Sequence, residues 1–363
     1  MQSIPRITQK GEPFYLFKAS GSHYEIGKAK GEQMSADLEA VWNMFSSRMC
    51  SDFGTPPEKE KQTYEWLRTN LERHVPWMAE QLEGMSDGSG MGLDRLYFTC
   101  HYGVLWSAGG VLCTSVAVKS DTEGPLLGQN LDIGGDDLYF VEELHPSNGY
   151  ATLSDGMAGM TWSPTGMNEC GLVVGSSNIC SPVRCGMRPV VGGVPYIFFP
   201  RMVLTQCADV PEAVELLKSH SPAIPPGGGY QLNLIDAKGN MAVVDKLEDR
   251  TVVRQCSESL NYTTNYSLDN DLEAFRTGDQ ATDPSFIARA EKIESAFSAA
   301  GGVVGESWLE RLLTDHSGDG RICKHGVSDN GYSRLSFIYI PNKLKMRISN
   351  GVPCLNVRQD FAL

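Results

Sequence analysis

Residues 109–133, GGVLCTSVAVKSDTEGPLLGQNLDI, contain the pattern that decides the fold. Small residues lead to Cys113, and the run that follows has the two-residue period of a β-strand. A turn-forming segment, SDTEGP, separates it from a second strand-like run that ends at Asp132. The spacing predicts a β-hairpin in which Asp132 returns to lie beside Cys113.

The composition is that of a globular protein with an excess of acidic groups. The chain has 363 residues, 41% hydrophobic and 21% charged, with a formal net charge of −13. This charge argues against nucleic acid or an anionic membrane as a partner. We recognise no signal peptide and no apolar run near the roughly 20 residues that span a bilayer. The ten cysteines are scattered without a CxxC pair, so we expect free thiols and a cytoplasmic protein.

Two regions of different pattern predict the layout of the elements. The first 110 residues are mostly helical in pattern, whereas short β-like runs separated by polar turns extend from Cys113 to about residue 180. This order of strands, helices and further strands predicts layered sheets with helices outside. We expect helices within 22–49, 56–88 (broken before Pro76), 93–106, 194–220 and 283–314, and hairpins at 230–247 and 333–349.

Two local motifs do not fit the context that their chemistry needs. GMSDG at 84–88 matches the GxSxG pattern of serine hydrolases, but a helical stretch precedes it, so we expect a turn that ends a helix. DHSGDGRICKHG at 315–326 begins like a calcium loop, but a glycine occupies its twelfth position. His316, Cys323 and His325 resemble a zinc set, but no fourth ligand is evident. We therefore expect no metal site.

The position of Cys113 at the start of a strand suggests a particular cysteine chemistry. A thiol nucleophile needs a base. Cutting the bond between Leu112 and Cys113 would give Cys113 a free α-amine, with a typical pKa of about 7.7–8.0 that suits a base. The charge of Asp132 would hold the amine or the thiol. Asn265, at the end of a strand-like run, would donate to the oxyanion of a tetrahedral intermediate.

Segments spread over nearly the whole chain resemble the acyl-coenzyme A:6-aminopenicillanate acyltransferase family, a cysteine branch of the N-terminal-nucleophile hydrolases. They occur in the order of that family: YEIGKAKGE (24–32), CTSVAV…GPLLGQNLD (113–132), GMNECGLVV (166–174), LNLIDAKGNMAVVD (232–245), TTNYSLD (263–269), LLTDHSGDGRICKH (312–325) and SRLSFIYIPNKLKMRISNGVPC (333–354).

The resemblance implies an α+β fold, a four-layer αββα sandwich. It implies that the uncut chain is a zymogen, which cleaves itself into a mostly helical fragment 1–112 and a catalytic fragment 113–363. We expect the two fragments to stay together as one compact domain. Cys113 would be the nucleophile, Asp132 its partner and Asn265 an oxyanion donor. Family members hydrolyse or transfer amide-linked acyl groups of small molecules, some with a coenzyme A thioester as donor, and no other cofactor is implied.

Further site residues and two departures concern the details. Ser333 and Arg334 occupy positions where the acyltransferase pattern has a serine near the acyl donor. Asn130, close to the aspartate, and Trp162, a candidate for an apolar acyl pocket, complete the expected substrate site. The family usually has glycine where this chain has Leu112, which would slow or block cleavage. The related bile-salt and penicillin V hydrolases tend to have an arginine just before the aspartate, and the segment GQNLD has none.

Two alternatives remain open from the residues themselves. A papain-like cysteine peptidase would use His101 or His316 as its base. A non-catalytic family member would bind a ligand or partner as an uncut precursor, and Leu112 is the residue that favours this alternative. Hydrolysis and acyl transfer are not distinguished by the sequence, because the choice depends on pocket shape and water access.

Overall fold

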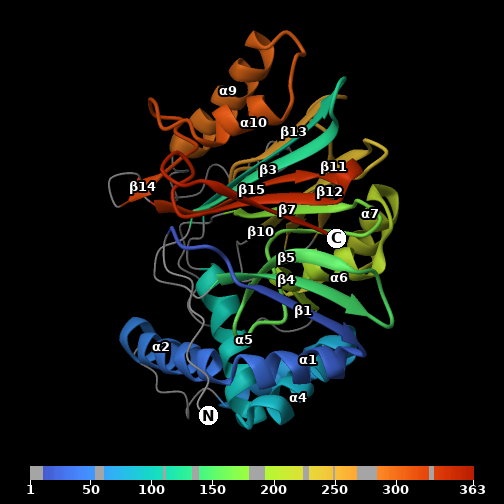
Figure 1. The fold of residues 1–363 in the computed structure, drawn as a ribbon, viewed down its shortest axis with the longest axis vertical. Helices are drawn as coiled ribbons and strands as arrows, with labels where there is room; N and C mark the ends of the chain where they lie inside the picture. Colours follow the sequence, from blue (N-terminus) through green and yellow to red (C-terminus); the bar gives the residue numbers. More distant parts are fainter. Residues whose placement is uncertain are drawn as a thin grey trace.

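The computed structural model describes residues 11–53, 61–108, 112–132, 139–179, 193–223, 229–247, 250–267, 284–326 and 331–363. Within them, two β-sheets lie face to face with helices on both outer sides (Figure 1). This arrangement confirms the expected α+β sandwich with four layers in the order αββα. None of the described helices is both long enough and apolar enough to cross a bilayer.

The first sheet has eight described strands, and its first strand comes from the segment that precedes Cys113. That strand, β1 (Leu16–Gly21), pairs in parallel with β4 at one edge. A cut before Cys113 would therefore leave both fragments in one sheet. In spatial order the other strands are β4 (Tyr139–Pro146), β5 (Thr152–Met157), β6 (Gly166–Asn168), β7 (Val173–Ile179), β10 (Gly229–Ile235), β11 (Met241–Leu247) and β12 (Thr251–Arg254).

The second sheet contains the hairpin with which the sequence analysis began. Strands β2 (Leu112–Ser120) and β3 (Gly124–Asp132) are antiparallel, as predicted, and β3 also pairs with β15 (Gly331–Ile340). The remaining strands are β13 (Leu260–Thr263) beside β2, β16 (Lys345–Asn350), β17 (Arg358–Ala362) and the short β14 (His325–Gly326) beside β15. A separate parallel pair joins β8 (Val194–Pro195) to β9 (Pro222–Ala223).

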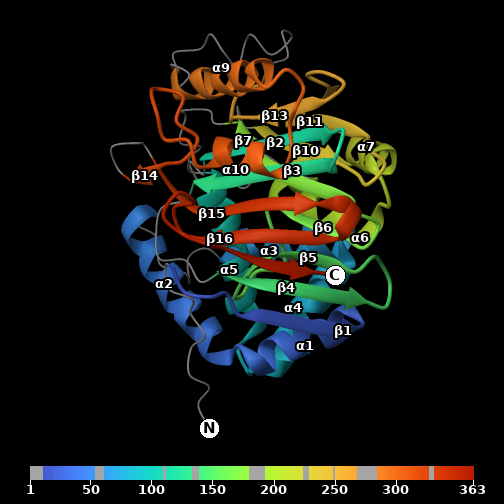
Figure 2. The ribbon, with the colours of Figure 1, turned by 45° about the horizontal axis from the view of Figure 1, so that its top comes forward.

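Helices cover the outer face of each sheet (Figure 2). On the second sheet lie α9 (Pro284–Ala299) and α10 (Glu306–Leu313), as the helical pattern in 283–314 predicts. On the side of the first sheet lie α1 (His23–Gln33), α2 (Ser35–Phe53), α3 (Lys61–His74), α4 (Pro76–Ser89), α5 (Leu93–Ala108), α6 (Phe199–Gln206) and α7 (Val210–Ser219).

Local signals account for the helix boundaries in the first segment, with one correction. Ser22 begins α1 with a capping box to Glu25, and the break before Pro76 is present. However, the single helix expected over 22–49 is two helices, because α1 ends at Met34, where the backbone leaves helical geometry. The next helix, α2, begins directly after it, at Ser35.

Glycines allow α1 and α4 to pack with their backbones in contact. A Cβ atom on Gly27 would lie 1.9 Å from the carbonyl oxygen of Gln81, and one on Gly84 would lie 2.0 Å from that of Tyr24. Any larger residue at either position would force the helices apart. This packing explains why GMSDG contains a glycine at position 84. The segment lies inside α4, whereas the sequence analysis expected a turn at the end of the helix.

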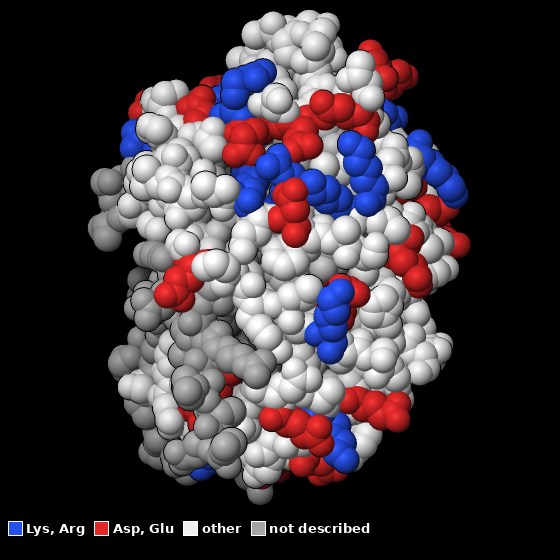
Figure 3. Space-filling model, in the orientation of Figure 1, with Lys and Arg blue, Asp and Glu red and all other residues white. Residues whose placement is uncertain are grey.

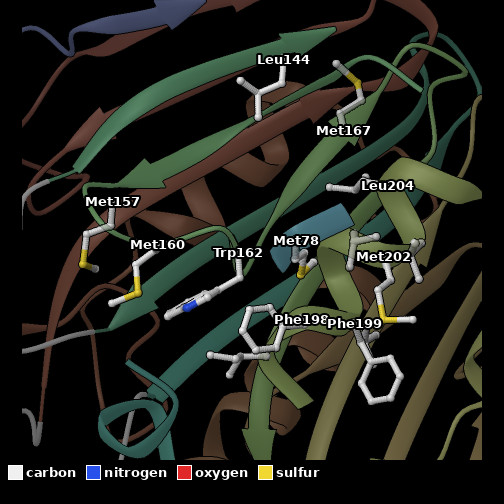
Figure 4. Close-up of a cluster of buried hydrophobic side chains, with 14 of the residues drawn as sticks. Met78, Leu144, Met157, Met160, Trp162, Met167, Phe198, Phe199, Met202 and Leu204 are labelled. Carbon is white, nitrogen blue, oxygen red and sulfur yellow. The ribbon is translucent and has the colours of Figure 1, made fainter. Parts of the chain in front are cut away.

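A large apolar core fills the space between the sheets and beneath the helices of the first sheet. It includes Met78 of α4, Met160 and Trp162 after β5, and Phe198 and Phe199 at the start of α6 (Figure 4). A second, smaller core lies between the second sheet and α9 and α10. The two cores lie on opposite faces of the second sheet, and β2, β3 and β15 contribute side chains to both.

The excess of acidic groups does not form a uniform acidic surface. On the face shown in Figure 3, Lys and Arg side chains lie among Asp and Glu side chains in the upper half. Two ion pairs link the C-terminal strands to α10, Arg347 with Glu306 and Arg358 with Glu310, and Arg347 also pairs with Asp360 of β17.

Candidate active site

Cys113 lies one residue into β2, and its thiol faces the space between the sheets. In the hairpin register, Cys113 is opposite Leu131 and Leu112 is opposite Asp132. The Cys113 side chain is 2% exposed and belongs to the inter-sheet core together with Leu131. Val116, on the other face of the strand, belongs to the core beneath α9 and α10. The alternation of the strand thus directs the thiol inward.

The backbone of Cys113 is held from two sides. Its N–H donates to Oδ1 of Asn265 over 2.9 Å. Its carbonyl oxygen accepts from Nη1 of Arg289 over 2.8 Å, and the same nitrogen lies 2.6 Å from Oγ1 of Thr114. These contacts fix the peptide groups on both sides of the Cys113 Cα atom.

Asn265 joins three segments at this point. It follows β13 with φ of 66°, in the left-handed region that Asn adopts more readily than most residues. Its Oδ1 also accepts from Nη2 of Arg289 over 3.1 Å, and its Nδ2 donates to the carbonyl of Asn178 over 2.8 Å. The sequence predicted Asn265 at Cys113, and the structure brings them together. Its role as an oxyanion donor stays a prediction, since Nδ2 carries a second hydrogen beyond the one given to Asn178.

Arg289 is a central residue of the site that the sequence analysis did not single out. Its side chain is fully buried, and Nη2 also donates to the carbonyl of Thr264 over 2.9 Å. One signal could have found it: Arg289 shares the apolar face of α9 with Phe286 and Ile293, where a charged group is unusual. The contact to Cys113 spans 176 positions, which no local pattern can predict.

Asp132 ends β3 on the side of the sheet that faces the helices. Its Oδ1 accepts from Oγ of Ser333 over 2.7 Å, and Nζ of the buried Lys324 lies 3.8 Å from Oδ2. Oγ of Ser333 in turn accepts from the backbone N–H of Lys324 over 2.9 Å. The register places Asp132 opposite Leu112 and Leu131 opposite Cys113, so the Asp132 side chain lies on the face of the sheet opposite the thiol.

The other expected substrate residues lie in different surroundings. Nδ2 of Asn130 donates to the carbonyls of Leu313 and Ile322, over 2.9 and 3.1 Å, and so connects β3 to the segment after α10. Trp162 lies in the apolar core among Met78 and Phe198 (Figure 4).

Arg334 follows Ser333 in β15 and is also buried. It bonds to Oδ1 of Asn350, and its guanidinium lies 5.6 Å from the ring centroid of Tyr139. Ser333 therefore contacts Asp132, whereas Arg334 connects β15 to β16 and to the start of β4.

The structure describes the side chain of one of the two histidines that the papain-like alternative would use as a base. The ring of His316 lies against that of His325, with centroids 4.9 Å apart, and its Nδ1 is 3.2 Å from the carbonyl of Thr314. The side chain of His101 lies outside the described residues.

Another buried carboxyl group, also absent from the sequence analysis, lies on the first sheet. Burial raises the pKa of Asp155 in β5 to about 7, although a hydrogen bond from Oγ of Ser163, 2.7 Å away, opposes the shift. The charge of Asp155 adds to burial in raising the pKa of Tyr339. Because Tyr339 belongs to the inter-sheet core, this aspartate faces the same layer as the thiol.

Comparison with protein-family models gives a match over more than half of the chain. A model of the family "Acyl-coenzyme A:6-aminopenicillanic acid acyl-transferase" matches residues 119–353, a range that contains Asp132 and Asn265 and begins six residues after Cys113. No curated protein matches.

Several solved structures are similar at low sequence identity. A conjugated bile acid hydrolase variant from Clostridium perfringens has a TM-score of 0.47 and 16% identity, covering 69% of this chain and 97% of its own. The Caenorhabditis elegans ortholog of N-acylethanolamine-hydrolyzing acid amidase has a TM-score of 0.44 and 18% identity, covering 63% and 93%. Penicillin V acylase from Agrobacterium tumefaciens has a TM-score of 0.38 and 16% identity, covering 66% and 83%.

The family match spans more than half of the chain, and the expected resemblance is confirmed. The chain belongs to the acyl-coenzyme A:6-aminopenicillanic acid acyl-transferase family.

Proposed function

We propose that this protein cuts its own chain between Leu112 and Cys113 and then uses Cys113 to hydrolyse or transfer amide-linked acyl groups of small molecules. The observation that carries the proposal is the hold on Cys113, whose nitrogen is fixed by Asn265 and whose carbonyl is fixed by Arg289. A nitrogen that is to become a catalytic amine needs such an anchor, because the amine must stay at the thiol after the chain is cut.

The cut requires no group beyond the chain itself and water. Sγ of Cys113 attacks the carbonyl carbon of Leu112, a C–S bond forms as the C–N bond breaks, and the thiol proton passes to the released nitrogen. Water then hydrolyses the thioester, which gives a carboxyl group on Leu112 and restores the thiol. We propose that Asp132, which pairs with Leu112 in the hairpin, orients the new amine.

Turnover uses the nucleophile and base that the cut provides. The α-amine takes the thiol proton as sulfur attacks the acyl carbon of the substrate, and it returns that proton to the leaving amine. The acyl-Cys113 intermediate is then resolved by water or by an acceptor amine. The positive charge of Arg289, bonded to Oδ1 of Asn265, favours the neutral amine that a base requires.

The substrate class follows from this chemistry and from the inter-sheet position of the thiol. In the uncut chain Cys113 is 2% exposed, so the new end at Leu112 has to move before a substrate reaches it. We propose a small amide as acyl donor, with a coenzyme A thioester as a second donor class. No metal or redox cofactor takes part in these steps.

The test is an intact mass measurement combined with turnover of a panel of acyl amides. Wild-type protein should give two masses, for 1–112 and 113–363, which co-elute on sizing. Cys113→Ala should give one full-length mass and no turnover, and Cys113→Ser should still cut slowly because an alcohol can make the same attack. Cys170→Ala, which removes a partly buried cysteine elsewhere, should match wild type. Full activity in an uncut wild-type chain would refute the mechanism.

A further inference from the structure

Four side chains of zinc-binding type meet beside β14. His316, Cys323 and His325 come from the segment after α10, and Cys354 comes from the turn that follows β16. One ligand atom from each lies within 4.8 Å of the others. The sequence analysis found the first three but not Cys354, which is 29 positions beyond His325 and is brought close by the pairing of β14, β15 and β16.

The distances among these atoms match the edges of a zinc tetrahedron. Zinc–sulfur and zinc–nitrogen bond lengths imply separations of about 3.8 Å between two sulfurs and about 3.6 Å between sulfur and nitrogen. The two Sγ atoms are 3.6 Å apart. Nε2 of His325 lies 3.6 Å from Sγ of Cys323 and 3.2 Å from Sγ of Cys354.

His316 has the orientation that a ligating histidine usually has. Its Nδ1 lies 3.2 Å from the carbonyl oxygen of Thr314, to which it can donate a proton. That bond would fix the tautomer and leave Nε2 as the ligand atom, a common arrangement around metal-bound imidazoles. His316 and His325 are exposed, whereas Cys323 is buried, so an ion has a path from solvent to the sulfurs.

The backbone holds this group of side chains in place without an ion. The carbonyl of Asp315 accepts from the N–H groups of Ile322 and Cys323, over 2.9 and 2.8 Å, and closes the loop. Lys292 of α9 pairs with the carboxylate of Asp315 over 2.8 Å. β14 adds the pairing of His325 with Tyr332.

We propose that His316, Cys323, His325 and Cys354 bind one Zn²⁺ as a four-coordinate structural site. Sulfur and imidazole ligands select zinc over calcium or magnesium, and four protein ligands leave no open position for catalysis. Two thiols lose their protons to solvent on binding, so the ion, two thiolates and two neutral imidazoles form an uncharged group. The site joins the turn after β16 to the loop that carries Lys324.

The location gives the ion a specific structural effect. Lys324, between two of the ligands, lies 3.8 Å from Asp132, and the carbonyl of Ile322 accepts from Asn130. Zinc would therefore stabilise the segment that contacts the end of β3 beside Leu112. It would do so without touching the reacting atoms.

The test measures metal in the full-length protein, purified under reducing conditions without chelator. We expect one zinc per chain. Cobalt(II) added to the metal-free protein should give the visible bands of a tetrahedral site and a thiolate-to-cobalt band in the near ultraviolet. His316→Gln, at an exposed position, and Cys354→Ser should lose the zinc, whereas the control Cys170→Ser should keep it. A chelator should lower the melting temperature of wild type and leave that of Cys354→Ser unchanged.

Three results would overturn the proposal. The first is the absence of stoichiometric zinc together with the absence of tetrahedral cobalt bands. The second is zinc that is retained in both His316→Gln and Cys354→Ser, which would place it elsewhere. The third is a Cys323–Cys354 disulfide, seen as the loss of two hydrogens by mass, in freshly isolated protein that contains no zinc.

Discussion

The two faces of the second sheet differ in their chemistry. The inner face has the thiol of Cys113 among apolar groups, and Asp155 lies across the same layer with a pKa raised to about 7 by burial. The outer face has the cations Arg289 and Lys324, which contact the strand ends. Because successive side chains of a strand point to opposite faces of the sheet, neighbouring residues of one strand lie in these two different environments.

This difference supports the proposal that the base is an α-amine. A buried thiol in an apolar layer is a poor nucleophile unless its proton has an acceptor within reach. The cations on the outer face contact the strand ends, and their positive charge makes them poor acceptors of the thiol proton. The nitrogen of Cys113 is the group that lies at the boundary of both faces, and Asn265 fixes it there. The predictions below test the two faces separately.

The largest effect is expected from Asn265, at the boundary of the two faces. Asn265→Asp keeps the oxygen that accepts from Cys113 and loses the Nδ2 donor. If Nδ2 donates to the oxyanion, kcat of cut protein should fall roughly a hundred- to a thousandfold, with KM little changed. Asn265→Gly, which tolerates the φ of 66°, should fall at least as far. A normal kcat with only a lower melting temperature would show that Asn265 is a turn residue without a catalytic role.

The sequence predicts the hairpin, but not its exact register or the long-range contacts of the site. Alternation and the SDTEGP turn are local, so Asp132 could be placed near Cys113, although the residue opposite Cys113 is Leu131. Arg289 and Cys354 reach their partners through tertiary packing, and neither has a neighbouring motif that shows its role. The break at Met34 was also missed, as was the close packing of α1 on α4 at Gly27 and Gly84, which joins residues far apart in the sequence.

The next effect concerns the inner face and is a pH dependence of stability. The folded protein holds the Asp155 proton more tightly than the unfolded chain, since its pKa is about 7 against an ordinary 3.8. Retention of this proton stabilises the folded protein by up to about 4 kcal/mol. This contribution is fully present below pH 3.8 and is lost as the pH rises to about 7. Asp155→Asn keeps the acceptor for Ser163 and should be more stable than wild type at pH 8.

Urea unfolding of both proteins from pH 4.5 to 8 measures this difference. The gap between Asp155→Asn and wild type should widen with pH and level off above 7. Glu215→Gln, an exposed carboxylate on α7, should show no such trend. A gap that is constant over this range would mean that Asp155 does not titrate there.

A smaller effect is expected on the outer face from Ser333→Ala. This change removes the donor to Asp132 and leaves the buried N–H of Lys324 without its acceptor. Loss of a hydrogen bond to a charged group costs about 1.5–3 kcal/mol of the free energy of unfolding. Ser349→Ala is the matched control, because its buried hydroxyl makes a longer bond of 3.5 Å. Equal urea midpoints for the two variants would show that the hydrogen bond between Ser333 and Asp132 adds little to stability.

The smallest effect concerns the bond to be cut and its position opposite Asp132. Leu112 belongs to β2, and its carbonyl has to leave strand geometry before the thiol can attack it. Glycine in a strand is less stable by about 0.5–1 kcal/mol, so Leu112→Gly should reach the attacking geometry more easily and cut roughly two- to fivefold faster. Leu112→Ala, which shortens the side chain without the added backbone freedom, should gain less. The rate is read as the decline of the full-length mass in freshly synthesised protein. If Leu112→Gly cuts no faster than Leu112→Ala, strand geometry before Cys113 does not limit the cut, and the bulk of the leucine side chain becomes the explanation for any slow processing.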